Sequence, residues 1–423
     1  MFFWYKFLSY LFYPFSYFFL LFRKLKKKED KNRYLEKIAK IKIKRKDGFL
    51  VWFHVASVGE AMSILPLVEN LKENEKINTI LITSITLSSG QILEKKYISN
   101  KKIIHQFLPL DIPIFVNKFL DHWSPNLSIF IDSEIWPNLI YNIKKRNIPL
   151  LLVNGRISKK TFFKWKFFKN FSKKVFDKFD LCIASSKEAE NYLKILGAKN
   201  IKSYGNLKFT KTKNDSSNYS DKKLAEKLKD RKIWCAASTH PTEEIFCSKI
   251  HLELKKIYSN ILTVIIPRHI SRTKKIADEL SSLNLNTTLY SDIEKLDGKT
   301  DILLVDSYGD SLKFYHNIKS VFLGKSIIKS LQNDSGQNPL EPSMAGCKIF
   351  HGPYVSNFKD EYEYLNSLGI TKKINDSKEL ENSLIEDFNL GKNTNDNVAE
   401  KIKKYGETIL NNVIKEIKIY INN

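Results

Sequence analysis

Short apolar runs alternate with stretches of helical periodicity along most of this chain. In its first half, runs of strand length lie at residues 49–55, 79–83, 103–108, 127–131, 150–153 and 181–184. Between them, apolar residues recur at helical spacing, for example at 114–123 and 187–196, and Gly197 is expected to end the second of these helices. This alternation predicts a parallel sheet with helices on both faces.

The same alternation returns after a polar segment. Residues 211–222, which read KTKNDSSNYSDK, have no periodicity and are the best candidate for a linker. Further strands are expected at 232–236, 262–266, 287–290, 302–305, 320–323 and 348–351, and the tail from about 397 to 423 has a helical pattern. We therefore expect an α/β fold with domains at 25–212 and 213–423 and a ligand-binding cleft.

The stretch from Val51 to Leu71 combines a strand, a small-residue turn and a helix. Glu60 falls where the turn becomes the helix. A carboxylate there lies near free backbone N–H groups and the positive end of the helix dipole, which favours the ionised form. Two interpretations follow: Glu60 is a general base at the carboxyl edge of the sheet, or it only helps the helix to begin.

The N-terminal segment, residues 1–24, is apolar and aromatic, and a basic cluster from Arg23 to Lys28 overlaps its end. Only 16 consecutive residues, from Phe7 to Phe22, are free of charge, and Pro14 interrupts them. We expect a retained membrane anchor, either a single pass or a deep interfacial helix, with the rest of the chain cytoplasmic. Residues 156–178 mix Phe, Trp and Lys, which fits a lipid-binding surface and fits a partly buried helix with a solvated lysine face equally well.

The formal net charge of +24 favours an anionic partner such as a nucleotide, a phosphorylated lipid or a membrane surface. The alternative is a bias toward lysine that is spread over solvated faces. The 4 cysteines are far apart, which argues against a zinc ribbon or a disulfide framework. GxGxxG and HExxH are absent, and LGKSI at 323–327 lacks the earlier glycine of a phosphate loop because Lys319 stands there.

Polar clusters follow the predicted strands of the second half repeatedly. They place several side chains that suit a phosphorylated ligand at strand ends: Ser238, Thr239, His240, Arg268, His269, Asn338 and Glu341. Any one of them could be an ordinary loop residue, but their joint occurrence points to a binding site.

Together with the first half, these clusters resemble one family, the 3-deoxy-D-manno-octulosonic acid (Kdo) transferases of lipopolysaccharide synthesis. The matching stretches occur in the family's order: SVGE (57–60), LPLDIP (108–113), SEIWPN (133–138), NGRIS (154–158), GNLK (205–208), STHPTEE (238–244), PRH (267–269), GQNPLEP (336–342) and GPYVSNF (352–358). The chain departs from the family pattern near the expected nucleotide site, at Asp310 and Ser311, at Lys325 and at Gln337.

The resemblance implies a GT-B glycosyltransferase with two Rossmann-like domains facing across a cleft and an N-terminal membrane-anchor helix. It further implies inverting, metal-independent transfer of Kdo from CMP-Kdo to the phosphorylated lipid A precursor (lipid IVA), at the cytoplasmic face of a bacterial inner membrane and with no cofactor. The family's catalytic residues correspond to Glu60 as the base and to Glu134 and Lys208, which are expected to stabilise the transition state. Its CMP-binding residues correspond to Arg268, His269, Gly309, Asp310, Ser311, Ser335, Gly336, Gln337, Asn338 and Glu341.

Two other functions remain as alternatives. A GT-B enzyme of the envelope that uses another nucleotide sugar would share the sheets but need not share SVGE, SEIWPN and GNLK together. A membrane-tethered RNA-binding protein is suggested by the charge alone, and the chain carries no RNP-type aromatic motif or KH loop, so we expect no nucleic-acid partner.

Overall fold

The computed structural model describes residues 1–210, 221–390 and 396–422 and contains two compact units. The first unit comprises residues 1–212 and 405–423, and the second comprises residues 213–404. The expected linker at 211–222 lies mostly outside the described residues. The expected second domain ran to residue 423, whereas the end of the chain belongs to the first unit.

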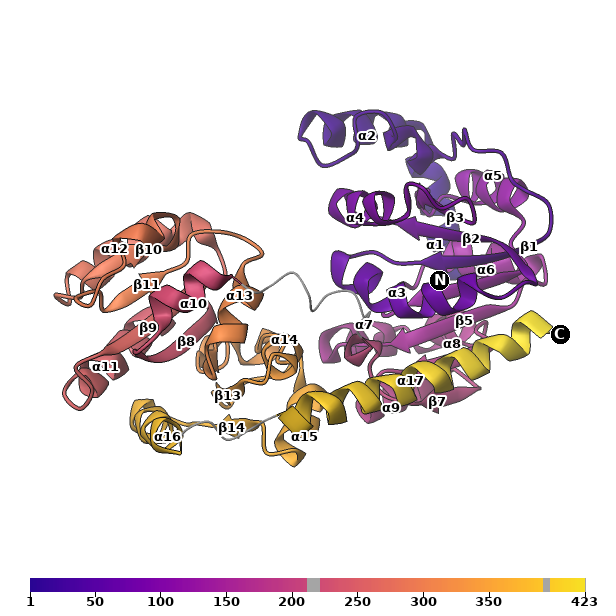
Figure 1. Cartoon of the computed structure of the whole chain (residues 1–423). Helices are drawn as coiled ribbons and strands as arrows, with labels where there is room; N and C mark the ends of the chain where they lie inside the picture. Colours follow the sequence, from indigo (N-terminus) through magenta and orange to yellow (C-terminus); the bar gives the residue numbers. More distant parts are fainter. Residues whose placement is uncertain (211–220, 391–395, 423) are drawn as a thin grey trace. The chain divides into compact units, whose positions relative to one another are not determined.

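The first unit contains a 7-stranded sheet in the order β3-β2-β1-β4-β5-β6-β7, and each strand pair in it is parallel (Figure 1). Its strands are β1 (Phe49–His54), β2 (Ile77–Ser84), β3 (Ile103–Phe107), β4 (Leu127–Ile131), β5 (Leu150–Gly155), β6 (Leu181–Ala184) and β7 (Ile201–Ser203). Its helices are α1 (Phe2–Phe12), α2 (Ser16–Leu25), α3 (Val58–Lys72), α4 (Leu87–Tyr97), α5 (Pro113–Trp123), α6 (Pro137–Lys145), α7 (Lys159–Phe167), α8 (Lys169–Phe176) and α9 (Lys187–Leu196), with 3₁₀ turns η1 (Tyr13–Phe15), η2 (Tyr34–Ile38) and η3 (Leu207–Phe209).

The second unit repeats this plan with the order β10-β11-β9-β8-β12-β13-β14, again with parallel pairs. Its strands are β8 (Lys232–Thr239), β9 (Ile261–Pro267), β10 (Thr287–Leu289), β11 (Ile302–Leu304), β12 (Ser320–Leu323), β13 (Lys348–His351) and β14 (Thr371–Lys373). Its helices are α10 (Lys222–Leu228), α11 (Glu243–Lys255), α12 (Thr273–Ser281), α13 (Ser311–Asn317), α14 (Leu340–Met344), α15 (Lys359–Ser367) and α16 (Ser377–Asn389), with 3₁₀ turns η4 (Ile270–Arg272), η5 (Tyr290–Lys295) and η6 (Lys329–Asp334); α17 (Asp396–Asn422) begins here and ends in the first unit.

The strand order creates a switch point in each sheet. β1 pairs with both β2 and β4, and β8 pairs with both β9 and β12; the chain builds each sheet outward on one side of the central strand and later continues on its other side. Open parallel sheets bind ligands at the carboxyl ends of the strands that flank such a point. We therefore expect functional residues in the loops after β1 and β4 of the first unit and after β8 and β12 of the second.

Central strands are buried on both faces, and for this reason they appear in the sequence as continuous apolar runs. β4 is buried along its whole length, and Trp52 of β1 packs against Phe119 and Phe130 with ring centroids 5.0 and 5.3 Å apart. Trp234, Phe322 and Phe350 have the same role in the second unit. The expected strands are present with small shifts at their ends, whereas the short edge strands β7 and β14 were not predicted because they are only 3 residues long and are not buried throughout.

The last helix, α17, packs against the first unit near the edge strand β7. Ile409, Ile417 and Ile421 of α17 are buried. Glu416 accepts hydrogen bonds from Lys202 and from the hydroxyl of Tyr204, both at 2.7 Å. The tail is helical as predicted, and its buried isoleucines and the Glu416 contacts hold it to the first unit.

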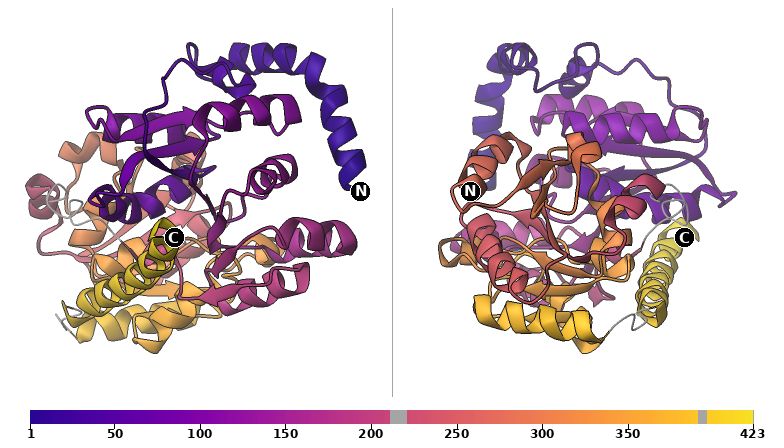
Figure 2. Two further views of the ribbon diagram at one scale, coloured as in Figure 1. Left: turned by 90° about the vertical axis from the view of Figure 1, so that its right-hand side faces the viewer. Right: turned by 60° about the vertical axis from the view of Figure 1, so that its left-hand side comes forward.

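The N-terminal segment consists of two short helices, α1 and α2, joined at the Pro14 turn (Figure 2). The hydroxyl of Tyr5 donates to Asp111 at 2.8 Å, and the side chain of Asn138 donates to Ser9 at 3.0 Å, so α1 is attached to the first unit. Across the described residues, the model has no helix with the length and apolar character needed to cross a bilayer.

Residues 156–178 form α7 and α8. Phe162 and Phe176 are buried, and Trp165 packs on Phe176, which matches the partly buried alternative for this stretch. Phe163 and Phe167 nevertheless remain 54% and 82% exposed, so the stretch also presents aromatic side chains to its surroundings.

Candidate active site

Glu60 lies in the first turn of α3, directly after β1. Ser57 is the N-cap of this helix and accepts a hydrogen bond from the backbone N–H of Glu60 at 3.3 Å. The Glu60 carboxylate reaches back to the N–H of Ala56 at 2.7 Å and the hydroxyl of Ser57 at 2.9 Å, which is a variant of the capping box in which the carboxylate binds the residue before the N-cap. Glu60 therefore does help the helix to begin, as the simpler interpretation held, and its position at the switch point leaves the catalytic interpretation open.

Burial raises the pKa of Glu60 above its ordinary value. The hydrogen bonds from Ala56 and Ser57 favour the carboxylate but do not offset burial, and the negative charges of Asp132 and Glu134 raise the pKa further. A raised pKa makes a carboxylate a better proton acceptor, provided that it is still ionised at the working pH.

Glu134 follows β4, the neighbour of β1 in the sheet. Burial alone would raise its pKa, but a hydrogen bond with His54 at 3.2 Å and one from the indole N–H of Trp136 at 2.8 Å hold the pKa of Glu134 below its ordinary value. His54 is fully buried in β1, where its other ring nitrogen lies 3.0 Å from the Thr83 hydroxyl. Two carboxylates with pKa values pushed in opposite directions are a pattern typical of acid–base sites.

Lys208 lies in η3, after β7, and belongs to the same electrostatic cluster. The side chain of Asn206 accepts a hydrogen bond from the backbone N–H of Lys208 at 3.0 Å. The positive charge of Lys208 lowers the pKa of buried Asp132, although burial, the larger effect, leaves that pKa raised. Asp132 in turn acts on Glu60, so the fold brings all three predicted catalytic residues into one group within the first unit.

Two residues of this group were not identified from the sequence. Asp132 precedes the SEIWPN stretch, and Asn154 opens NGRIS; their side chains are joined by a hydrogen bond of 2.5 Å. His54 was also missed, because a histidine inside an apolar strand resembles an ordinary core residue. Only the pairing of β1 with β4 shows that His54 contacts Glu134.

In the second unit, polar side chains gather after β8 and β9. Arg268 and His269 are exposed at the end of β9, and the N–H of Arg268 donates to the carbonyl of Thr239 at 3.0 Å. The His240 and His269 rings lie 6.1 Å apart. Burial, together with the charges of Lys325 and His269, lowers the pKa of His240. The edge is thus rich in groups that bind an anion.

Glu243 organises the loop after β12. Its carboxylate is fully buried and accepts hydrogen bonds from the backbone N–H groups of His240 at 2.9 Å, Lys325 at 2.7 Å and Ser326 at 3.2 Å. It therefore connects the two loops that flank the switch point of the second sheet. Apart from the position of Glu243 in STHPTEE, no sequence pattern indicated this role.

The remaining predicted nucleotide contacts form two loops. In the first, Gly309 has a left-handed φ of 88°, and Ser311 begins α13. Asp310 is held by Lys313 at 2.8 Å and by the Ser307 hydroxyl at 2.5 Å; burial would raise the pKa of Asp310, but these contacts hold it below its ordinary value.

The second loop, residues 335–341, is connected to the β12 loop. The N–H of Gly336 donates to the carbonyl of Lys325 at 2.7 Å, and Ser335 contacts the Ser356 hydroxyl at 3.1 Å. The carbonyl of Gln337 accepts from Tyr362 at 3.1 Å. The two remaining predicted contacts in this loop differ in their surroundings. Asn338 accepts a hydrogen bond from the N–H of Leu340 at 3.1 Å, whereas Glu341 is exposed in α14.

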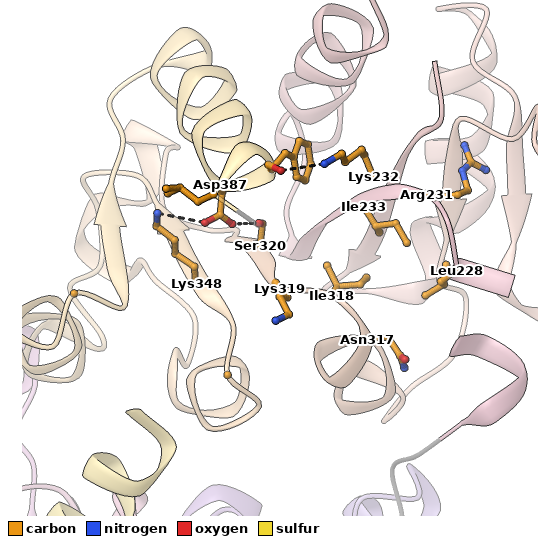
Figure 3. Close-up of a pocket in the computed structure, with 14 residues that line it drawn as sticks. Leu228, Arg231, Lys232, Ile233, Asn317, Ile318, Lys319, Ser320, Lys348 and Asp387 are labelled. Carbon is orange, nitrogen blue, oxygen red and sulfur yellow. Dashed lines mark hydrogen bonds and ion pairs between the residues drawn. The ribbon is translucent and has the colours of Figure 1, made fainter. Parts of the chain in front are cut away.

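A separate pocket of about 560 Å³ lies at the opposite, amino edge of the second sheet (Figure 3). Two of the lysines that line it have structural partners: Lys348 lies 3.4 Å from Asp387, and Lys232 donates to the carbonyl of Phe388 at 3.0 Å. Arg231 donates to several backbone carbonyls.

Comparisons with known proteins agree on one family. A family model described as 3-Deoxy-D-manno-octulosonic-acid transferase (kdotransferase) matches residues 30–211. A 3-deoxy-D-manno-octulosonic acid transferase of Rickettsia bellii is 34% identical over 416 residues, which cover 98% of this chain and 96% of that protein. A probable mitochondrial 3-deoxy-D-manno-octulosonic acid transferase of Arabidopsis thaliana is 30% identical over 379 residues, 87% of this chain and 84% of that protein.

Among solved structures, a glycosyltransferase from Rickettsia africae matches with a TM-score of 0.54 and 14% identity, covering 89% of this chain and 98% of that chain. At this identity the likeness concerns the fold alone. The two parallel-sheet α/β units resemble those of GT-B glycosyltransferases.

Proposed function

Because this chain belongs to the 3-deoxy-D-manno-octulosonic acid (Kdo) transferase family, and is thus a Kdo glycosyltransferase of lipopolysaccharide synthesis, we propose that it transfers Kdo from CMP-Kdo to lipid IVA with inversion. The observation that carries the proposal is the pair of carboxylates at the switch point of the first sheet. Glu60 has a raised pKa and Glu134 a lowered one, so one is suited to accept a proton and the other to stay charged.

Glu60 acts as the general base in this mechanism. It takes the proton of the acceptor hydroxyl while that oxygen forms a bond to the anomeric carbon of Kdo, and the bond from this carbon to the phosphate oxygen breaks. Attack from the face opposite to the leaving CMP inverts the anomeric centre. A positioned base typically contributes about 10²–10⁴-fold to the rate of such a step.

The two other residues respond to the charge that develops in the transition state. Glu134, kept ionised by His54 and Trp136, faces the positive charge that builds up on the Kdo ring as CMP departs. Lys208 offers a cation to the phosphate that leaves. Because these groups are held in place before the reaction begins, their charges need no reorganisation.

The second unit holds the donor in this proposal. Arg268 and His269 bind the anionic phosphate, and their exposure at the end of β9 supports that role. The CMP moiety contacts the 309–311 and 335–338 loops and Glu341, and no metal ion or cofactor takes part. Asp310 is occupied by Lys313, which suggests that the backbone of its loop, with Gly309 in the left-handed region, makes the contact there.

We also propose attachment to the cytoplasmic face of a bacterial inner membrane through the N-terminal segment. The exposed side chains of α1 and α2 form an aromatic and aliphatic face: Phe3, Trp4, Phe7, Leu8, Leu11, Phe15, Phe18 and Phe22. The basic cluster that begins at Arg23 complements anionic lipids. The attachment of α1 through Tyr5 supports an interfacial arrangement, with Phe167 of α7 as a further contact for acyl chains.

The decisive experiment measures Kdo transfer from freshly made CMP-Kdo to a tetra-acylated lipid A precursor in detergent, followed by NMR determination of the product anomer. Wild-type transfer with inversion is expected, and E60Q should lose at least about 10²-fold in kcat. The matched control is E69Q, which changes a carboxylate farther along the same helix that pairs with Lys72 at 2.7 Å; because this partly exposed pair lies outside the proposed catalytic group, activity should stay within about twofold of wild type.

Each other outcome is informative. Transfer by E60Q at the wild-type rate would remove Glu60 from the role of base. The proposal that CMP-Kdo is the donor would be refuted if folded wild type, offered several nucleotide sugars in competition, used a uridine or guanosine sugar and not CMP-Kdo. Flotation with anionic vesicles tests the membrane proposal: a variant with Phe3, Trp4 and Phe18 changed to serine should float less than wild type.

A further inference from the structure

Asp132 is a buried carboxylate of the first unit to which the proposed mechanism assigns no role. It follows the last residue of β4, and only 8% of its surface is exposed. Its backbone is in the left-handed region, with φ of 54°. Few non-glycine residues adopt this conformation, and aspartate and asparagine do so more readily than the others, so at Asp132 it marks a sharp change of chain direction at the end of the strand.

Asn154, in the neighbouring strand β5, has the same unusual conformation, with φ of 57°, and is 1% exposed. Its side-chain amide donates to Asp132 at 2.5 Å, while the N–H of Asp132 donates to the carbonyl of Val153 at 3.2 Å. The two strained residues thus hold each other at the carboxyl edge of the sheet. Strained backbone that is retained in this way is concentrated at functional sites.

The other end of the Asn154 side chain reaches the loop that carries Lys208. Its oxygen accepts a buried hydrogen bond from the N–H of Leu207 at 2.9 Å. Asn206 completes the loop by accepting from the N–H of Lys208. One continuous set of hydrogen bonds therefore runs from Asp132 through Asn154 to the backbone beside Lys208.

The charges around Asp132 come from several elements. Lys208 in η3 and Arg156 after β5 lower its pKa, and Glu134 in its own loop raises it; burial, the largest effect, leaves the pKa of Asp132 above its ordinary value. Asp132 also raises the pKa of Glu60 on α3. Asp132 thus interacts electrostatically with both the proposed cation and the proposed base.

We propose that Asp132, held by Asn154, is a positioning residue of the transferase that orients Lys208 and presents a fixed negative charge to Glu60. This inference rests on the proposed roles of Glu60 and Lys208. It deepens them by naming the residue that couples the two groups.

The test uses two folded variants of the full-length chain. D132N keeps the shape and removes the charge, so the acidic limb of kcat/KM against pH should move down by about half to one pH unit, because Glu60 loses a neighbouring negative charge. N154L removes both hydrogen bonds and keeps the Asp132 charge. It should lower kcat about tenfold or more because Lys208 is misplaced, and it should shift the acidic limb of kcat/KM much less than D132N does.

A second measurement does not depend on activity. Labelling of Lys208 by an amine-reactive reagent, quantified on its peptide, should rise about threefold or more in both variants. Lys144, which pairs with Asp180 at 2.8 Å, should label as in wild type and serves as the internal control. Unchanged Lys208 labelling, or an unchanged acidic limb in folded D132N, overturns the inference. If wild type transfers no Kdo, the proposed function fails, and the labelling result still decides whether Asp132 orients Lys208.

Discussion

Glu243 provides the sharpest test of how the second unit is built. Its buried carboxylate accepts hydrogen bonds from the N–H groups of His240, Lys325 and Ser326. Replacement by alanine leaves these donors without an acceptor in a region closed to water. At about 1–3 kcal/mol for each buried group left unpaired, with partial relaxation, we expect E243A to lose about 3–6 kcal/mol.

Replacement by glutamine should cost less. The amide keeps the volume and one accepting oxygen, but its NH₂ group would face the N–H donors that the second oxygen served. We expect a loss of about 2–4 kcal/mol for E243Q. The matched control is E379Q in α16, where an exposed carboxylate accepts from the N–H of Asn375 at 2.7 Å; water can replace that contact, so the change should be within about 0.5 kcal/mol.

Hydrogen exchange measured by mass spectrometry is the appropriate assay, because the chain has two units and a single unfolding midpoint would mix them. Peptides that cover β8 and the 323–336 loop should exchange faster in E243Q, by a factor of about 30 or more. Peptides of the first unit should be unaffected. If E243Q protected the 323–336 loop as well as E379Q does, the carboxylate would not be holding that loop and our account would be refuted.

Three further substitutions test packing and buried charge. Gly352→Ala should cost about 1–3 kcal/mol, measured by hydrogen exchange of peptides from the second unit, because a Cβ there would overlap the backbone carbonyl of Ser326; no change would mean that the loop moves aside without cost. Arg272→Ala should cost about 3–5 kcal/mol by the same measurement, since it leaves the fully buried Glu244 without the guanidinium that binds it at 2.8 and 3.1 Å; a loss below about 1 kcal/mol would contradict this. Phe119→Ala should cost about 3–5 kcal/mol, measured by hydrogen exchange of peptides from the first unit, and a smaller effect would indicate that the core collapses into the cavity.

The sequence by itself determined the strand and helix content of both units, because strands buried on both faces need continuous apolar runs and amphipathic helices need their own period. It also singled out Glu60, Glu134 and Lys208 as candidates, because each lies in a short motif that can be recognised locally; their catalytic role stays a prediction. It did not predict β7 or β14, whose few partly exposed residues carry no pattern. Nor did it place the end of the chain, because helical periodicity does not say which surface the helix covers.

The tertiary structure alone decided how the predicted residues are supported. His54 acts on Glu134 only because β1 and β4 are neighbours, although 80 positions separate the two residues. Asp132 and Asn154 become partners because β4 pairs with β5 and both chains turn through the left-handed region at the same edge. The physical reason is common to these cases: a buried polar side chain must find its partner, and the strand order determines which partner lies within reach.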